Sequence, residues 1–259
     1  MLTRILTAIV GIVLFVAVLM APPIVLYVAL FLLGAWLLFE VYRVMDAKRE
    51  MFAVGLLAEI IMFIFFFAGR IGMAFYGAIL LFMAAMVLLW KRNNSKEVLP
   101  LGMVTLFITS TVLSLVVLHA NFNVFAFLLP CIIAWATDTG AYFTGYFFGK
   151  HKLAPQMSPK KTIEGAIGGI IIAVLATVAY GIIIYGNFYT IGMIKYAIVG
   201  GAGSVVAQIG DLAASCIKRD FDKKDYGALL PGHGGLMDRF DSVLFVAPYV
   251  LFMILYFGI

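Results

Sequence analysis

Residues 193–214, MIKYAIVGGAGSVVAQIGDLAA, and residues 240–258, FDSVLFVAPYVLFMILYFG, are two apolar runs, each long enough to form a helix that crosses a membrane. Between them lies a charged block, defined here as residues 215–241, SCIKRDFDKKDYGALLPGHGGLMDRFD. The charged block contains five of the 18 Lys and Arg residues and five of the 13 acidic residues of the chain. Such a block must be solvated, ion-paired or bound to a charged ligand at the membrane surface.

The same apolar character extends over the whole chain. Hydrophobic residues make up 64% of the sequence and charged residues 12%, whereas a soluble domain is about half apolar. Apolar windows long enough to span about 30 Å of hydrocarbon recur along it. We therefore predict an all-α, polytopic integral membrane protein with about nine transmembrane helices. The predicted windows are 5–21, 24–41, 51–68, 71–90, 101–118, 124–148, 163–185, 193–214 and 240–258.

The basic residues indicate which way these helices run. If nine spans alternate, 16 of the 18 Lys and Arg residues fall on one side of the membrane, and only Arg70 and Lys195 fall on the other. By the positive-inside rule the crowded side is cytoplasmic, so we expect a cytoplasmic N-terminus and a C-terminus, at Ile259, outside. Arg4 before an apolar run also resembles a signal peptide, but no small-x-small cleavage site precedes Pro22, so we expect a retained helix.

Composition limits the remaining possibilities. Basic residues outnumber acidic residues, and the pI is near 9.1. This excess of positive charge fits loops that face anionic lipid rather than nucleic acid. The two cysteines, Cys131 and Cys216, indicate neither a disulfide framework nor a zinc site. We expect one integral-membrane domain over residues 1–259, with five N-terminal spans in 1–123 and a catalytic half in 124–259.

Ionisable residues inside the apolar windows are costly and usually have a function. Glu59 lies midway along the third window, where a structural hydrogen bond or ion pair between helices would also explain it. Asp138 lies in the sixth window, and the hydroxyl groups of Thr137 and Thr139 are its expected local partners. We therefore treat Asp138 as a candidate site residue and leave Glu59 open.

Asp211 is the third clear case of an ionisable residue well inside an apolar window. Ser215 and Lys218 follow it at i+4 and i+7, which places the three side chains on one helix face. A stabilising pair between Asp211 and Lys218 would explain part of this pattern. The charged block that follows favours a functional carboxylate.

A second polar segment, residues 149–165, precedes the seventh window. We predict that Ser158 caps a helix whose first residue is Pro159, so that Lys160 and Lys161 lie in the first helical turn. The helix dipole disfavours cations in this turn, but an anion bound between them would explain them. The segment therefore favours a phosphate site, and the alternative is that its lysines only set the topology.

Asp238 and Asp241, at the end of the charged block, are three residues apart and share a helix face. The glycine-rich residues 231–235, PGHGG, precede them and allow the backbone to approach a ligand closely. If both meet Asp211, three carboxylates form the oxygen-rich site that Mg²⁺ prefers, which points to phosphoryl or nucleotidyl transfer. The alternatives are a solvated loop and an ion-conducting site. Five basic residues would surround the site: Lys218, Arg219, Lys223, Lys224 and Arg239.

The charged block resembles the signature of the phosphatidate cytidylyltransferases, also called CDP-diacylglycerol synthases. That signature runs Ser-x-apolar-Lys-Arg, four residues, Lys-Asp-x-small, then Pro-x-His-Gly-Gly-apolar-x-Asp-Arg-apolar-Asp, and the chain meets it without departure. Segments 138–142, 158–165 and 210–211 also resemble family blocks, so the resemblance covers roughly residues 124–259. The signature positions are Ser215, Ile217, Lys218, Arg219, Lys224, Asp225, Gly227, Leu230, Pro231, His233, Gly234, Gly235, Leu236, Asp238, Arg239, Phe240 and Asp241.

This resemblance implies transfer of CMP from CTP to phosphatidic acid, with Mg²⁺, at the cytoplasmic face of a bacterial inner membrane. It implies cation-binding carboxylates at Asp211 and Asp238, to which geometry adds Asp241 and Asp225. His233 would either donate to a phosphate oxygen or hold the glycine turn. The predicted catalytic residues are Asp211, Lys218, Lys224, Asp225, His233, Asp238 and Arg239, and the predicted metal ligands are Asp211, Asp238 and Asp241. The predicted substrate-binding residues are Asp138, Ser158, Lys160, Lys161, Thr162, Ser215, Arg219, Gly234 and Gly235.

Two other functions are compatible with parts of this pattern. A CTP-dependent kinase of an isoprenoid or other lipid alcohol would release CDP rather than pyrophosphate. A transporter would use Asp138, Asp211 and Glu59 along its path, although such sites concentrate at the membrane midplane between repeats, and no repeat is evident. The expected partners are CTP, phosphatidic acid and membrane lipids, without nucleic acid. The sequence leaves open a second cation, a homodimer, the acyl-chain preference and the choice between CTP and dCTP.

Overall fold

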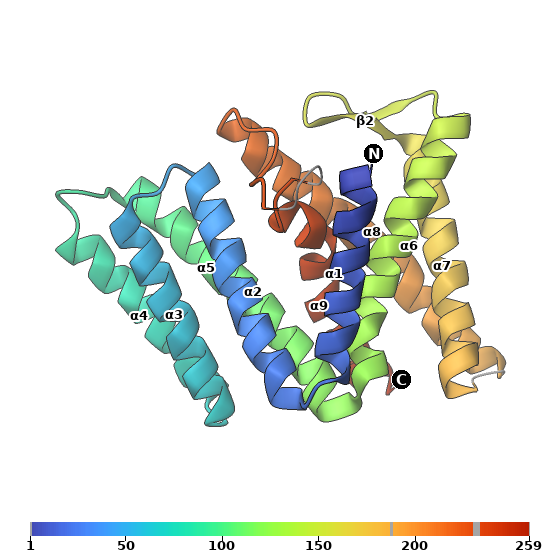
Figure 1. Cartoon of the computed structure of the whole chain (residues 1–259), viewed down its shortest axis with the longest axis horizontal. Helices are drawn as coiled ribbons and strands as arrows, with labels where there is room; N and C mark the ends of the chain where they lie inside the picture. The colour runs from blue at the N-terminus through green and yellow to red at the C-terminus, as the bar shows by residue number, and fades with distance from the viewer. Residues whose placement is uncertain (1, 187–188, 230–233, 259) are drawn as a thin grey trace. The chain divides into compact units, whose positions relative to one another are not determined.

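Long helices dominate this chain, whose structure is a computed structural model that describes residues 2–186, 189–229 and 234–258 (Figure 1). Each predicted apolar window coincides with a helix, which confirms the all-α polytopic architecture. In the described part of the chain, eight helices are long and apolar enough to cross a membrane, and α1 adds a shorter apolar stretch, Ile9–Met20. The helices are α1 (Leu2–Met20), α2 (Pro23–Val44), α3 (Arg49–Phe67), α4 (Ile71–Leu88), α5 (Ser95–Val117), α6 (Val124–Phe148), α7 (Ile163–Tyr185), α8 (Thr190–Asp220) and α9 (Met237–Phe257).

Helices α5 and α8 extend furthest beyond their predicted windows. Helix α5 begins at Ser95 and is followed by a π-helical turn, Leu118–Phe122. Helix α8 has 31 residues and continues to Asp220, so it carries Asp211, Ser215 and Lys218 on one uninterrupted helix. The predicted windows left out the polar ends of these two helices, because hydropathy reports the surrounding medium and not the backbone conformation.

The predicted helix start at Ser158 is wrong. Ser158–Thr162 forms strand β2, which pairs in antiparallel fashion with β1 (Lys152–Ala154), and α7 begins only at Ile163. Thr162 caps this helix instead, since its Oγ1 accepts a hydrogen bond from Gly165 N at 3.1 Å. Lys160 and Lys161 therefore lie on a strand and not in a first helical turn.

The chain divides into two compact units, which are described separately. The first unit contains Met1–Leu113 and Phe221–Asp238, and the second contains Ser114–Asp220 and Arg239–Ile259. Most of the charged block therefore clusters with the N-terminal helices, although its sequence neighbours α8 and α9 lie mainly in the second unit.

Polar groups are buried between the helices of the first unit. The Tyr42 hydroxyl lies 2.7 Å from Thr105 Oγ1 and reaches it past Gly55, where a Cβ would lie 2.6 Å from the same hydroxyl. Glu59 is fully buried beside Gly34, and neither of its carboxylate oxygens has a hydrogen-bond partner among the described residues. The structural hydrogen bond that would have explained Glu59 is therefore not present.

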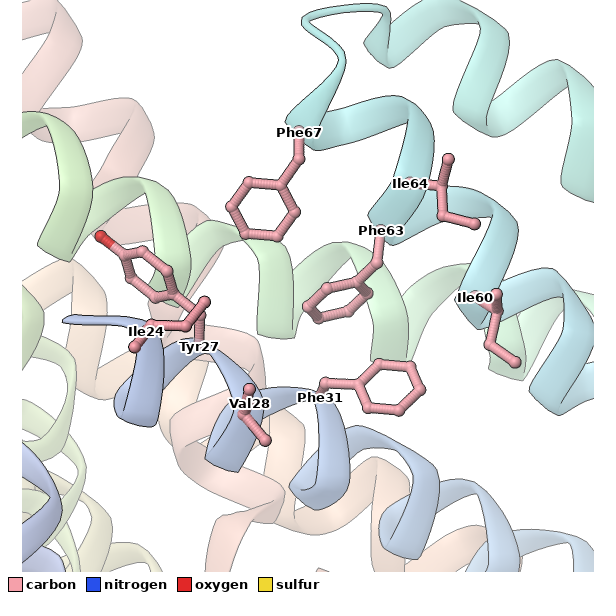
Figure 2. Close-up of a pocket in the computed structure, with 8 residues that line it drawn as sticks. All are labelled: Ile24, Tyr27, Val28, Phe31, Ile60, Phe63, Ile64 and Phe67. Carbon is pink, nitrogen blue, oxygen red and sulfur yellow. The ribbon is translucent and has the colours of Figure 1, made fainter. Parts of the chain in front are cut away.

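An apolar groove lies between α2 and α3 (Figure 2). Figure 2 shows its walls as aromatic and branched aliphatic side chains, and the rings of Phe31 and Phe63 meet edge to face at 5.2 Å. None of the predicted site residues lines it. The lining residues are Ile24, Tyr27, Val28, Phe31, Ile60, Phe63, Ile64 and Phe67.

Small residues hold the helices of the second unit together. Helices α6 and α7 lie side by side, with the hairpin at one end of the pair (Figure 1). A Cβ at Gly165 would lie 2.8 Å from the Ala141 carbonyl oxygen, and one at Gly169 would lie 2.9 Å from that of Thr137. Since only glycine permits such close backbone contact, these positions fix the spacing of α6 and α7.

Candidate functional site

An ion pair between Asp211 and Lys161 lies at the centre of the candidate site in the second unit. Lys161 Nζ lies 2.6 Å from Asp211 Oδ2, and both side chains are partly covered, with exposed fractions of 25% and 29%. Ser215 Oγ lies 3.5 Å from Asp211 Oδ1, one turn further along α8. The predicted common face of α8 is therefore confirmed. Asp211 forms its ion pair with Lys161 of β2, a partner that sequence spacing does not indicate.

Further charges of both signs surround this ion pair. Asp138 of α6 and Asp241 of α9 both lie within electrostatic range of Asp211. Arg239 lies within electrostatic range of Asp138. Lys218, which is 8% exposed, lies within electrostatic range of Asp241. The second unit thus gathers three carboxylates and several cations that are far apart in sequence, an arrangement typical of sites that bind polyanions together with a cation.

One of the two partners expected for Asp138 is engaged elsewhere. The Thr137 hydroxyl donates to the Ile133 carbonyl oxygen at 2.7 Å, so its single proton is not available to Asp138. Asp138 itself is exposed and lies within electrostatic range of Lys161. An exposed carboxylate next to cations is available to a ligand, which favours a site role.

The β1–β2 hairpin, which carries Lys161, is fixed by contacts at both ends. Glu164 Oε1 lies 2.6 Å from His151 Nδ1, and Glu164 Oε2 accepts the backbone N–H of Lys150 at 3.1 Å. At the turn, Arg219 Nε of α8 donates to the Met157 carbonyl oxygen at 3.3 Å. The Arg219 guanidinium thus holds the hairpin, whereas Lys160 is exposed and free to meet a ligand from solvent.

In the first unit, the charged block folds around its own carboxylate, Asp238. Asp238 Oδ2 accepts the backbone N–H of Tyr226 at 2.8 Å and that of Gly235 at 3.0 Å. Gly234, between them, has φ of +84°, a left-handed conformation that suits glycine. Because the Gly235 N–H is already bonded to Asp238, that group is not available to a substrate phosphate in this arrangement.

A second carboxylate in the same place, Glu40 of α2, was missed by the sequence reasoning. Glu40 Oε1 accepts the backbone N–H of Leu236 at 3.0 Å, and Oε2 accepts that of Met237 at 2.7 Å. Glu40 is 2% exposed. A signal did exist, since Glu40 lies inside the second apolar window. The partner could not be found from spacing, however, because 196 residues separate Glu40 from Leu236.

The remaining predicted residues of the charged block are placed as follows. Lys224 and Asp225 are exposed in the first unit, and Lys223 forms a 3.9 Å ion pair with Asp46. His233, together with Leu230, Pro231 and Gly232, lies outside the described residues. Its role stays a prediction.

The donor set fits a hard cation in type. Asp211 and Ser215 offer only oxygen atoms, the ligands that Mg²⁺ prefers, and Mg²⁺ is usually held by one or two protein carboxylates together with substrate phosphates. Within either unit, the residues that the structure describes contain no group of three His, Cys, Asp or Glu side chains close enough to hold a metal. The predicted ligand set of Asp211, Asp238 and Asp241 therefore stays a prediction.

Comparisons with known proteins agree with the resemblance of the charged block. A model of the cytidylyltransferase family matches residues 2–257. A phosphatidate cytidylyltransferase of Bacillus subtilis is 44% identical over 128 residues, which cover 49% of this chain and 46% of the relative. The protein of the same name from Staphylococcus aureus strain COL is 47% identical over 119 residues, which cover 45% and 44%. The chain thus spans about half the length of the curated relatives it matches.

Proposed function

This chain belongs to the cytidylyltransferase family, and from that membership we propose that it transfers CMP from CTP to phosphatidate, giving CDP-diacylglycerol and pyrophosphate. The observation that carries the proposal is the Lys161–Asp211 ion pair inside a cluster of carboxylates and cations on membrane helices. Curated relatives named phosphatidate cytidylyltransferase, at 44–47% identity, support the lipid substrate.

The reaction requires positioning and charge compensation more than proton transfer. An oxygen of the lipid phosphate attacks the α-phosphorus of CTP, and the bond from that phosphorus to the bridging oxygen breaks, so that pyrophosphate leaves. The second pKa of a phosphate monoester is about 6, so the nucleophile is already largely dianionic near neutral pH. A general base is therefore unnecessary, and the main barrier is the approach of two polyanions.

The described residues supply this charge compensation. The ammonium group of Lys161 is available to a phosphate once it separates from Asp211, and Lys218 and Arg239 add positive charge in the same unit. Mg²⁺, when bound, would neutralise phosphate oxygens and stabilise the departing pyrophosphate. Asp211 and Asp238 are the carboxylates proposed to hold it. Asp211 thus has a cation partner whether or not substrate is bound.

The decisive experiment incubates the purified protein with phosphatidate, Mg²⁺ and CTP labelled in the cytosine ring. Label in the lipid phase together with released pyrophosphate supports the proposal. A parallel incubation uses a lipid alcohol and CTP labelled at the γ-phosphate. Transfer of that label to the alcohol, with release of CDP, would instead show a lipid kinase. Ion flux into liposomes without nucleotide, and no labelled lipid, would show a transporter.

Lys161→Gln is expected to lower kcat/KM by about tenfold to a hundredfold, because a charge-assisted contact to phosphate contributes about 1.5–3 kcal/mol. The residue lies on β2 and forms an ion pair with Asp211, so its loss also leaves Asp211 without that cation. Initial rates at varied CTP and phosphatidate concentrations measure the effect.

Lys152→Gln is the matched control, because Lys152 lies on the paired strand β1 and is exposed. It should lose much less activity than Lys161→Gln. Equal and small losses at both positions would mean that the hairpin lysines serve topology alone.

The protein is a multi-pass membrane protein, and we propose that its site faces the cytoplasm of a bacterial cell. The charge asymmetry supports this orientation. In a variant without Cys131 and Cys216, a cysteine at position 160 or 223 should resist an impermeant thiol reagent on intact cells, while one at position 195 should react. Labelling at position 223 from outside would reverse the topology.

A further inference from the structure

Glu40 takes no part in the chemistry proposed above, and we propose that it is a positioning residue that holds Gly235 and the start of α9 in place for nucleotidyl transfer. Its contribution to turnover depends on the proposed function, whereas its hydrogen bonds do not. Glu40 belongs to α2, and its partners Leu236 and Met237 belong to the charged block, all within the first unit.

Glu40 acts as a helix cap supplied by a different helix. The first N–H groups of a helix have no partner within it, and the N-terminus favours negative charge. Leu236 N and Met237 N, at the start of α9, both donate to the Glu40 carboxylate. Trp36 Nε1, one turn earlier on α2, also donates to Oε1 at 3.0 Å. A buried carboxylate with three donors is well satisfied.

Two glycines of the signature make room for this carboxylate. A Cβ at Gly227 would lie 2.6 Å from Glu40 Oε1, and a Cβ at Gly235 would lie 2.6 Å from Oε2. Real Cβ atoms do not approach an oxygen so closely, so both positions require glycine while Glu40 is in place. The sequence interpretation assigned the glycine turn to a substrate. In the structure, Gly235 and Gly227 accommodate Glu40 instead.

The hydrogen bonds of Glu40 are continuous with those of Asp238. Gly235 N donates to Asp238 Oδ2, and the next two N–H groups along the chain donate to Glu40. Three successive N–H groups are therefore shared between two carboxylates. Loss of the Glu40 carboxylate would leave both of its backbone donors without that partner and loosen the segment that orients Asp238, without removing any group that touches substrate.

The test uses the full-length protein in nanodiscs and compares Glu40→Gln with Trp36→Phe. Glutamine keeps the size of Glu40 but directs an NH₂ group at one of the backbone donors. Trp36→Phe removes a donor to the same carboxylate and leaves both backbone contacts in place. Hydrogen–deuterium exchange at Leu236 and Met237, kcat, KM for CTP and the unfolding temperature are measured for each variant.

Glu40→Gln should accelerate exchange at Leu236 and Met237 by about tenfold or more and lower kcat by about tenfold to a hundredfold, consistent with hydrogen bonds to a charged group. KM for CTP and exchange in α3 and α4 should change little. Trp36→Phe should remain near the parent in exchange and kcat. Unchanged exchange at the two amides, or faster exchange throughout the first unit, would overturn the positioning role.

A second pair of variants keeps the proposal testable if Glu40→Gln does not fold. Gly227→Ala should lower kcat because its Cβ collides with Glu40, and adding Glu40→Asp, which is one methylene shorter, should restore part of that loss. Additive losses in the double variant would overturn the proposal. If the parent protein makes no labelled lipid, the proposed function fails, but the exchange measurement still decides whether Glu40 holds the turn.

Discussion

Asp211→Asn is expected to lower CDP-diacylglycerol formation by about a hundredfold to a thousandfold, the range seen when a key electrostatic group of an active site is removed. Asparagine keeps the volume of Asp211 but removes the charge that pairs with Lys161 at 2.6 Å and that is proposed to hold Mg²⁺. The protein should remain folded in the membrane, because α8 is held by packing along its length. Initial rates at saturating Mg²⁺ measure the effect.

Asp220→Asn is the matched control for this variant. Asp220 is the last residue of α8, is exposed, and has no place in the proposed site. It should retain turnover near that of the parent, with the same yield from the membrane fraction. Near-parent turnover of Asp211→Asn at saturating Mg²⁺ would eliminate the proposed metal role of Asp211.

Asp238→Asn is expected to lower activity by a similar factor, about a hundredfold to a thousandfold. For this residue, the effect of the charge can be separated from that of the hydrogen-bond acceptor. One oxygen, Oδ2, accepts the N–H groups of both Tyr226 and Gly235. An asparagine oxygen can still accept both, so the turn should keep its shape while the charge is lost. Asp238→Ala removes the charge and the acceptor together. Activity should therefore fall in both variants, whereas exchange at the Tyr226 and Gly235 amides should rise only in Asp238→Ala.

Asp222→Asn tests whether any charge in this block has the same effect. Asp222 is exposed and has φ of +53°, a conformation that asparagine also tolerates. Its activity should stay near that of the parent. Equal exchange at Tyr226 and Gly235 in Asp238→Ala and in the parent would contradict the described role of the carboxylate.

The fold could be predicted because the bilayer imposes a simple length rule. A segment that crosses the hydrocarbon must pair its own backbone N–H and C=O groups, which a helix does. Apolar windows therefore predict helices with little dependence on tertiary contacts. The rule fails where the chain leaves the bilayer. At Ser158 a good capping sequence competes with a hairpin, and the hairpin forms because His151, Glu164 and Arg219 hold its two ends.

The candidate site could be predicted only where its residues share a helix. The face formed by Asp211 and Ser215 follows from helical spacing alone. The pair between Asp211 and Lys161 depends on how β2 meets α8, which no local pattern encodes. Glu40 is the extreme case, since its partners are 196 and 197 residues away in sequence. Residues joined by long-range packing are therefore those that sequence spacing misses.

The length of α8 bears on how a lipid could reach the site. Its 31 residues extend about 46 Å at 1.5 Å per residue, whereas the hydrocarbon core is about 30 Å thick. The helix is therefore long enough to cover the hydrocarbon and still project beyond it, with Asp211 and Ser215 on its C-terminal third. Lifting a lipid into water costs about 0.8 kcal/mol for each methylene, or tens of kcal/mol for two chains. Under the proposed function, Asp211 would lie near the height of the lipid phosphates, so substrate and product would exchange by lateral diffusion within the leaflet without that extraction.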